Sequence, residues 1–368
     1  MARIIALVGG GTMGPVVPLL ALQKKLAQRH PEDKFVWVGT PDGPERAPVE
    51  ALGIPFVALP VAKLPRYLTW RLFMVYWEYR RARKAAIKFL DDWKPDMIIG
   101  AGGFTQVPII RAASRRGIPC AIHQLDFVPL LSNRLVAKYC RLITTTFIYH
   151  QKKLTVPIFK YSLKMPVEEM PIATPNRYVG KRIPEKIAAM EHFGFDSDRP
   201  LVLFVGGGTG SRALNTVVET HLDKWLSKTQ VLQITGKGRS LGAQERPGYV
   251  KQEFFNEDDF LRALMAADVI VSRAGMGSIT DLATLYRPSI LVPINHSPQE
   301  QNARRLPLAV IEVRETPRLF EDLFHQVSHL LNHPQEKLKF GYELHRTIRT
   351  DDGSEWANLI ERFLPQEE

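Results

Sequence analysis

Three glycine-rich segments of this chain are candidates for binding phosphate. They run from Gly9 to Gly14, from Gly206 to Ser211 and from Ser272 to Asp281, and each follows a short apolar run and precedes a helical pattern. Glycines after a strand permit a tight turn, and the unpaired amides at the start of the next helix can hold a phosphate group. A turn without any ligand also explains the first segment. The repetition of the device within one chain favours ligand binding.

The third segment predicts part of a nucleotide-sugar site. Its strand ends at Ser272, and its helix is expected to begin near Ser278. Asp281 lies one turn into that helix, where a carboxylate can accept hydrogen bonds from both hydroxyls of a ribose. Gln299 and Asn302 follow three residues apart, so they share a helix face and offer donors and acceptors to sugar hydroxyls. The alternative without a ligand makes Ser278 an N-cap and Asp281 a first-turn acid.

The elements that must position these loops alternate between strands and helices. Continuous apolar strands separated by helical patterns predict parallel sheets that are buried on both faces. An NAD-dependent enzyme is disfavoured because the strand at 34–38 leads into Gly39-Thr40, without the acidic residue that binds a ribose in such enzymes. The expected strands are 4–8, 34–38, 55–59, 97–100, 119–123, 201–205, 230–235, 250–254, 269–272 and 289–292.

The chain of 368 residues suits two domains of roughly 150–200 residues each. The alternation of strands and helices is interrupted by a proline-rich stretch and then resumes with a second strand–glycine–helix unit. We therefore predict an α/β fold with two Rossmann-like domains whose parallel sheets face each other across a cleft. The expected parts are an N-terminal domain over 1–163, a linker leading into the second domain over 164–198, a second domain over 199–350, and a C-terminal helix within 351–368 that packs back on the first domain.

Composition favours a soluble globular protein, with 45% hydrophobic and 24% charged residues. No apolar run reaches the roughly 18 residues that span a bilayer, and the apolar start at 4–8 is too short for a signal peptide. The two cysteines, Cys120 and Cys140, lack metal-type spacing, so neither a disulfide framework nor a metal site is expected. These features favour the cytoplasm.

The net charge of +11 is concentrated in the first half, because residues 1–165 carry about +15 and the remainder about −4. A basic half implies an anionic partner. Trp70, Phe73 and Trp77 recur at helical spacing among basic residues that include Arg80 and Arg81. This pattern predicts a segment that lies on an anionic membrane surface. A core helix with a solvated basic face is the alternative, and no nucleic-acid-binding signature is present.

The ordered set of motifs resembles the MurG family of glycosyltransferases. The donor signature of that family is similar to Gly275–Asp281 followed by Gln299-x-x-Asn302-Ala303, and the resemblance extends from the first strand to about Leu306. Further matching segments are Gly10-Gly11-Thr12-x-Gly14 with Pro18, Gly102-Gly103-Phe104 with Pro108, His123-Gln124-Leu125-Asp126 with Ser132-Asn133, Gly206-Gly207 and Gly210 with Arg212 and Asn215, and Thr235-Gly236-Lys237-Gly238.

Members of this family transfer N-acetylglucosamine from UDP-GlcNAc to lipid I, which yields lipid II for peptidoglycan. The resemblance therefore implies an inverting hexosyltransferase of the GT-B type that needs no metal or other cofactor. It implies a peripheral location on the cytoplasmic face of the cell membrane and a role in cell-wall biogenesis, cell shape and cell division. The implied partners are UDP-GlcNAc, lipid I and an anionic membrane surface, with cell-wall synthesis proteins as candidates and no nucleic acid.

The resemblance also assigns roles to residues. For the base that takes the proton of the acceptor hydroxyl it leaves two candidates, Asp126 and His123, of which Asp126 is favoured as a carboxylate in place of an amide. The alternative for His123 is a structural residue at the end of a strand. The acceptor and its diphosphate are expected at Gly11, Thr12, Met13, Gly14, Gly102, Gly103, Phe104 and Asn133. The donor is expected at Gly207, Gly208, Thr209, Gly210, Arg212, Lys237, Phe255, Met276, Gly277, Ser278, Asp281, Gln299 and Asn302.

The chain departs from the family pattern chiefly on the acceptor side. Pro15 occupies the position where the first loop of the family usually carries histidine. Gln124-Leu125-Asp126 replaces the Glu-Gln-Asn segment of the family. Asp281 replaces a longer glutamate. Two alternatives therefore stay open: a GT-B transferase with another lipid-linked acceptor, and a homologue that binds UDP-sugars with impaired catalysis.

Overall fold

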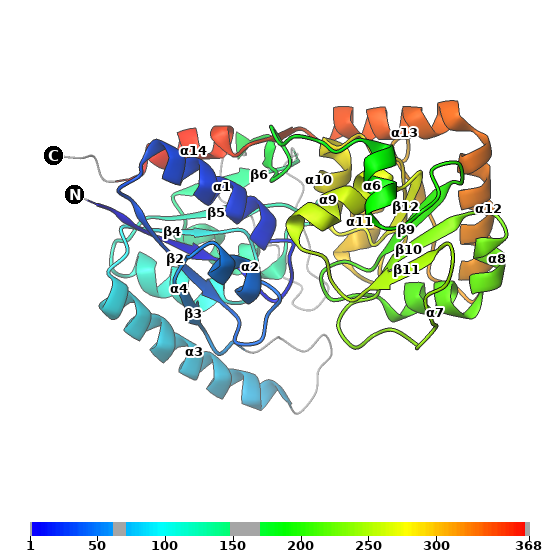
Figure 1. The fold of residues 1–368 in the computed structure, drawn as a ribbon. Helices are drawn as coiled ribbons and strands as arrows, with labels where there is room; N and C mark the ends of the chain where they lie inside the picture. The colour runs from blue at the N-terminus through cyan, green and yellow to red at the C-terminus, as the bar shows by residue number, and fades with distance from the viewer. Residues whose placement is uncertain (1, 62–70, 148–169, 365–368) are drawn as a thin grey trace. The chain divides into compact units, whose positions relative to one another are not determined.

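The computed structural model describes residues 2–61, 71–147 and 170–364. It divides into two compact units (Figure 1), one formed by Met1–Arg177 with Asp351–Glu368 and the other by Tyr178–Thr350. The passage from the first unit to the second falls inside the stretch 164–198, where the sequence predicts a linker. A short two-stranded sheet of β8 (Thr174–Pro175) and β15 (Thr350–Asp351) joins the segments that leave and re-enter the first unit.

The first unit is built on a parallel sheet with the strand order β3-β2-β1-β4-β5-β6-β7. Three strands, β4, β5 and β6, are buried along their whole length, and β1 and β2 are buried after their first residue, as expected for a sheet covered on both faces. The strands are β1 (Ile4–Val8), β2 (Lys34–Gly39), β3 (Phe56–Ala58), β4 (Met97–Gly100), β5 (Cys120–Gln124), β6 (Leu142–Thr145) and β7 (Met170–Pro171).

Helices cover both faces of this sheet because successive strand residues point to opposite sides. Ile5 and Leu7 pack with α1 (Val16–Arg29), α2 (Arg46–Ala51) and α14 (Ser354–Glu361). Ala6 and Val8 pack on the other side with α3 (Arg71–Trp93), α4 (Gln106–Ser114) and α5 (Leu131–Val136), which runs into the short 3-10 helix η1 (Ala137–Tyr139).

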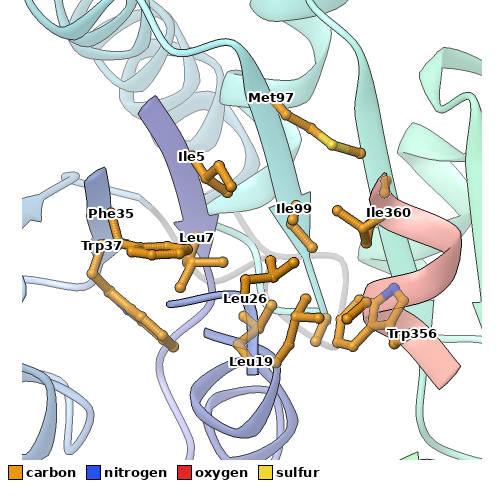
Figure 2. Close-up of a cluster of buried hydrophobic side chains, with 14 of the residues drawn as sticks. Ile5, Leu7, Leu19, Leu26, Phe35, Trp37, Met97, Ile99, Trp356 and Ile360 are labelled. Carbon is orange, nitrogen blue, oxygen red and sulfur yellow. The ribbon is translucent and has the colours of Figure 1, made fainter. Parts of the chain in front are cut away.

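The last helix, α14, is part of the core of the first unit. Figure 2 shows Trp356 and Ile360 pointing from α14 toward Ile99 of β4, and both side chains are fully buried. At the surface, Glu361 accepts hydrogen bonds from Arg29 at 3.1 Å and contacts the ring of His30 at 3.1 Å. The C-terminal segment therefore completes the hydrophobic layer that covers one face of the first sheet.

The second unit contains a parallel sheet with the order β11-β10-β9-β12-β13-β14. One face is covered by α7 (Arg212–Thr220), α8 (Leu222–Leu226) and α12 (Leu319–Asn332). Two further pairs of helices contact each other, α6 (Lys186–His192) with α9 (Glu257–Ala266), and α10 (Met276–Thr284) with α13 (Pro334–Thr347). The strands are β9 (Leu201–Val205), β10 (Gln230–Ile234), β11 (Tyr249–Gln252), β12 (Val269–Ser272), β13 (Ser289–Leu291) and β14 (Ile311–Glu312), and α11 (Pro298–Arg304) follows β13.

The predicted α/β class is confirmed, and the predicted strands agree with the structure to within two residues at either end. The sequence did not predict β6, β7, β8, β14 or β15, none of which is longer than four residues. The helix expected near Ser278 begins earlier, at Met276, with Gly275 as its N-cap. Ser278 therefore lies inside the first turn of α10, and its interpretation as an N-cap is wrong.

Candidate functional site

Each sheet has a point where its strand order reverses direction. In the first unit β1 lies between β2 and β4, and in the second unit β9 lies between β10 and β12. Loops that leave the carboxyl ends of the two strands at such a point open a crevice in which α/β proteins bind ligands. In both units these two loops are glycine-rich segments found in the sequence, Gly9–Gly14 with Ala101–Thr105 in the first and Gly206–Gly210 with Arg273–Gly277 in the second.

The loop after β9 is shaped by glycines and packs against the loop after β10. Gly207 and Gly210 have φ angles of 78° and 72°, a region that favours glycine. A Cβ at Gly210 would overlap the carbonyl oxygen of Thr235 and lie 2.7 Å from the Cα of Gly236. This close approach brings Lys237, which is exposed, to the same end of the sheet.

A buried amide fixes the loop that carries Lys237. Asn215 donates from Nδ2 to the carbonyl oxygens of Thr235, at 3.0 Å, and Arg239, at 2.9 Å. Its Oδ1 accepts a hydrogen bond from Gln233 at 3.1 Å. The loop is therefore held from α7, whose first residue, Arg212, has an exposed side chain. Arg212 and Lys237 are therefore exposed cationic residues beside these two loops.

The loop after β12 is supported from α11. Asn302 is fully buried and donates to the carbonyl oxygen of Ala274 at 3.1 Å. The prediction that Asn302 reads a sugar hydroxyl does not fit this position, because its amide is enclosed and braces the loop. Gln299 is partly exposed and accepts a hydrogen bond from the amide of Ile294 at 3.1 Å. Its side chain lies beside Gly275, since a Cβ added to Gly275 would be 3.8 Å from the Nε2 atom of Gln299.

The start of α10 presents the remaining predicted donor residues. Gly277 and Ser278 are partly exposed, whereas Met276 is 2% and Asp281 is 3% exposed. Asp281 lies in the second turn of α10. Of the predicted residues in the loop after β9, Gly208 and Thr209 are exposed.

One ion pair near this loop was not predicted from the sequence. Arg273 is buried and donates from Nη1 to the carbonyl oxygen of Val292 at 3.1 Å and to Glu315 at 2.6 Å. The contact joins the ends of β12 and β13 to the segment after β14. The local sequence does not predict this ion pair, because Arg273 and Glu315 are far apart along the chain.

Phe255 lines a pocket of about 340 Å³ in the second unit. Its ring contacts that of Phe193 with a centroid distance of 5.3 Å. Two polar residues of the wall are fixed in place, since His192 contacts Asp259 at 3.1 Å and Asn256 caps α9 by accepting from the Asp259 amide at 2.8 Å. The wall consists of His192, Phe193, Val250, Gln252, Phe254, Phe255, Asn256 and Asp259, of which the sequence predicted only Phe255.

The two glycine loops of the first unit pack against each other. Gly11, Gly102 and Gly103 have φ angles of 82°, 121° and 85°, and a Cβ at Gly103 would lie 2.8 Å from the carbonyl oxygen of Gly10. The amide of Gly102 donates to Gln106 at 3.1 Å, so it is already used within the protein. Of the other residues of these loops that were predicted to bind the acceptor, Thr12 is exposed, and Met13, Gly14 and Phe104 are partly exposed.

Asn133 corrects a second prediction. It is fully buried, accepts a hydrogen bond from Gln106 at 2.5 Å, and donates to Gln124 at 2.6 Å and to the carbonyl oxygen of His123 at 3.2 Å. Because both ends of the amide are engaged, Asn133 connects the second glycine loop to the end of β5, and the predicted contact with an acceptor does not fit this position.

The two candidates for the catalytic base differ in access. His123 is fully buried, its ring nitrogens contact the hydroxyls of Thr144 at 3.0 Å and Thr146 at 3.2 Å, and burial lowers its pKa to about 3. A base must reach the proton that it removes, so the prediction for His123 is wrong. Asp126 is partly exposed, and Gln124 donates to its backbone carbonyl oxygen at 2.8 Å. Asp126 is therefore the more accessible of the two candidates.

The basic helix α3 presents an exposed aromatic residue. Trp77 is 63% exposed, and the guanidinium of Arg80 lies 5.7 Å from its ring centre. Arg81 is also exposed, whereas Ala86 and Phe89 face the core. Trp70 and the side chain of Phe73 lie outside the described residues. Among the described helices none is long and apolar enough to cross a bilayer.

Two family models match the chain. Residues 5–145 match the glycosyltransferase family 28 N-terminal domain, and residues 201–342 match the C-terminal domain of the same family. Together these matches cover most of both units, including all the glycine loops.

Full-length relatives carry one shared name. The chain is 32% identical to the Listeria monocytogenes UDP-N-acetylglucosamine–N-acetylmuramyl-(pentapeptide) pyrophosphoryl-undecaprenol N-acetylglucosamine transferase, over 89% of this chain and 90% of that protein. It is 28% identical to the transferase of the same name from Desulforamulus reducens, over 98% of each chain. The crystal structure of Acinetobacter baumannii MurG aligns with a TM-score of 0.69 and 20% identity over 98% of this chain and 100% of that one, which confirms the GT-B fold. On these grounds the chain belongs to the MurG family of N-acetylglucosaminyltransferases.

Proposed function

We propose that this chain transfers N-acetylglucosamine from UDP-GlcNAc to lipid I and so forms lipid II for peptidoglycan. The observation that carries the proposal is the arrangement at the strand-order reversal of the second unit. There two glycine loops leave the adjacent strands β9 and β12, and the start of α10 follows one of them directly. The relatives that share most of the chain are named for this reaction.

The donor would be held entirely by the second unit. The amides of Gly207–Gly210 and of the first turn of α10 would bind the diphosphate, with Arg212 and Lys237 adding positive charge. Gln299 would contact the sugar, whereas Asp281 is only 3% exposed, so the predicted contact with the ribose does not fit its position. The pocket beside Phe255 supports a place for the uracil, because it combines aromatic rings with fixed polar groups.

The chemistry would be a direct displacement at the anomeric carbon. The acceptor hydroxyl attacks that carbon, its proton passes to a base, and the bond to the β-phosphate breaks, so that UDP leaves and the configuration inverts. Asp126 is the proposed base. Loop amides and the positive end of α10 would stabilise the charge that develops on UDP, and preorganised donors of this kind are the usual source of such stabilisation.

The acceptor side would lie in the first unit, at the loops Gly9–Gly14 and Ala101–Thr105. A lipid-linked acceptor requires access to a membrane, and the basic helix α3 with Trp77 supports a peripheral position on the cytoplasmic face. Replacing Trp77 with serine should weaken binding to vesicles that contain anionic lipid. Tyr342→Ser is the matched control, because Tyr342 is 61% exposed and belongs to the second unit. Unchanged vesicle binding by Trp77→Ser would remove the support for α3.

The function itself is tested by UDP release with purified substrates. The wild-type chain should release UDP from UDP-GlcNAc when lipid I is present, and much more slowly with UDP-glucose as donor. Release with a different lipid-linked sugar but not with lipid I would establish another acceptor. Calorimetric binding of UDP-GlcNAc without UDP release would establish a homologue with impaired catalysis.

A further inference from the structure

The carboxylate of Glu45 lies buried beneath the first glycine loop. Glu45 is fully buried and comes from the segment between β2 and α2. One carboxylate oxygen accepts hydrogen bonds from the amide and the hydroxyl of Thr40, both at 2.6 Å. The other accepts from the amide of Gly11 at 3.1 Å. An internal anion therefore holds an amide of the loop that the sequence suggested for the acceptor diphosphate.

Three glycines make room for this carboxylate. A Cβ at Gly10 or at Gly43 would overlap the Glu45 oxygens, and a Cβ at Gly39 would lie 3.0 Å from one of them. The glycines come from the ends of β1 and β2 and from the turn before α2. The three glycines and the two residues that donate hydrogen bonds therefore all converge on one side chain. Such convergence indicates a site built around the carboxylate.

The first glycine loop is held at further points on the same side. The indole of Trp37 donates to the carbonyl oxygen of Gly9 at 2.9 Å, and the Gly9 amide donates to Val38 at 3.2 Å. Beyond Gly11 the loop becomes exposed at Thr12. Glu45 is thus the last anchor before the part of the loop that a ligand can reach.

We propose that Glu45 is a positioning residue for the acceptor: its carboxylate fixes Gly11 and so sets the conformation of Thr12, Met13 and Gly14. Glu45 does not contact the substrate. Its negative charge also occupies the Gly11 amide, so the acceptor phosphates must be bound by other groups of the two loops. This inference rests on the proposed function, since it assigns the loop to the lipid-linked acceptor.

Glu45→Gln tests the proposal with little change in shape. The new amide keeps one oxygen for Thr40 but turns an N–H toward the Gly11 N–H, which cannot accept it. The KM for lipid I should rise about tenfold, the effect of losing roughly one buried hydrogen bond. Binding of UDP-GlcNAc, measured by calorimetry, should stay within about twofold, since the donor loops belong to the second unit. Glu50→Gln is the matched control, because Glu50 is an exposed carboxylate on α2 that pairs with Arg46.

A merely structural role would give a different result. If Glu45→Gln lowers the melting temperature but leaves KM and kcat for lipid I at wild-type values, the proposal is overturned. If that variant does not fold, Thr40→Val decides, because it removes only the hydroxyl donor to Glu45. Its KM for lipid I should rise about two- to threefold, and a wild-type KM would reject the proposal.

Hydrogen exchange separates this inference from the proposed function. The Gly11 amide should exchange slowly in the wild-type chain and faster in Glu45→Gln, whatever the acceptor is. A wild-type chain that does not act on lipid I would refute the proposed function alone. Equal exchange rates at Gly11 in both chains would show that Glu45 does not hold the loop.

Discussion

Alanine at Gly210 should separate the two loops that form the diphosphate side of the donor site. Both Gly207 and Gly210 have positive φ angles, so alanine at either position costs about 1 kcal/mol in backbone strain. Only at Gly210 does the new Cβ meet other atoms, the carbonyl oxygen of Thr235 and the Cα of Gly236. Forcing a methyl group into packed structure adds about 1–3 kcal/mol. The expected loss of unfolding free energy is therefore about 2–4 kcal/mol for Gly210→Ala and about 1 kcal/mol for Gly207→Ala.

Urea unfolding measures the free energy of unfolding of both variants. Calorimetry then measures the binding of UDP-GlcNAc to Gly210→Ala. We expect UDP-GlcNAc to bind about tenfold more weakly to Gly210→Ala, because the displaced loop carries Lys237 away from the phosphates. Gly207 is the matched control for stability, since a Cβ there meets nothing within 4 Å. Equal stability of the two variants, together with wild-type donor affinity in Gly210→Ala, would refute the packing of these loops as the basis of the site.

Three further predictions follow from the described contacts. Asn302→Ala should lower both the melting temperature and the affinity for the donor. Gln299→Ala should lower donor affinity with little change in melting temperature. An equal decrease in melting temperature in the two variants would contradict the role of Asn302 in supporting the loop. His123 has a pKa of about 3 in the folded chain and one near 6.5 in the unfolded chain, so the unfolded chain binds its proton first as the pH falls. The free energy of unfolding should therefore decrease below pH 6.5, by up to about 1.4 kcal/mol per pH unit. In urea titrations from about pH 7 to about 4.5, His123→Gln should reduce this pH dependence, and identical slopes in the two chains would contradict the prediction. Treatment with EDTA should leave UDP release unchanged, and loss of activity that Mg²⁺ restores would show that the chemistry needs a metal.

The loops were predictable because their determinants are local. A continuous apolar strand, glycines and a helical pattern follow one another within about a dozen residues, and the same order gives the strand–turn–helix units of both sheets. The fold class followed from the repetition of these units along the chain. The predicted start of α10 was wrong by two residues because Gly275 ends the extended backbone before Ser278 is reached.

The roles of individual polar residues depended on packing between distant segments. The sequence left His123 open as a base or as a structural residue at a strand end, and its ring lies against Trp356 from the other end of the chain, with a centroid distance of 5.0 Å. Asn302 and Asn133 look like ligand-binding amides, but each is enclosed by a loop that it supports. Glu45 was not predicted at all, because the amides that it binds come from two different strand ends.

The most direct measurement of the central claim is the mass of the lipid product. The wild-type chain, incubated with UDP-GlcNAc and lipid I in detergent, should convert lipid I into a species heavier by one N-acetylhexosamine, with one UDP released per product molecule. Asp126→Asn should form that product much more slowly while binding UDP-GlcNAc normally. Lipid I that stays unchanged in the wild-type reaction, while UDP-GlcNAc binds or is merely hydrolysed, would contradict the account.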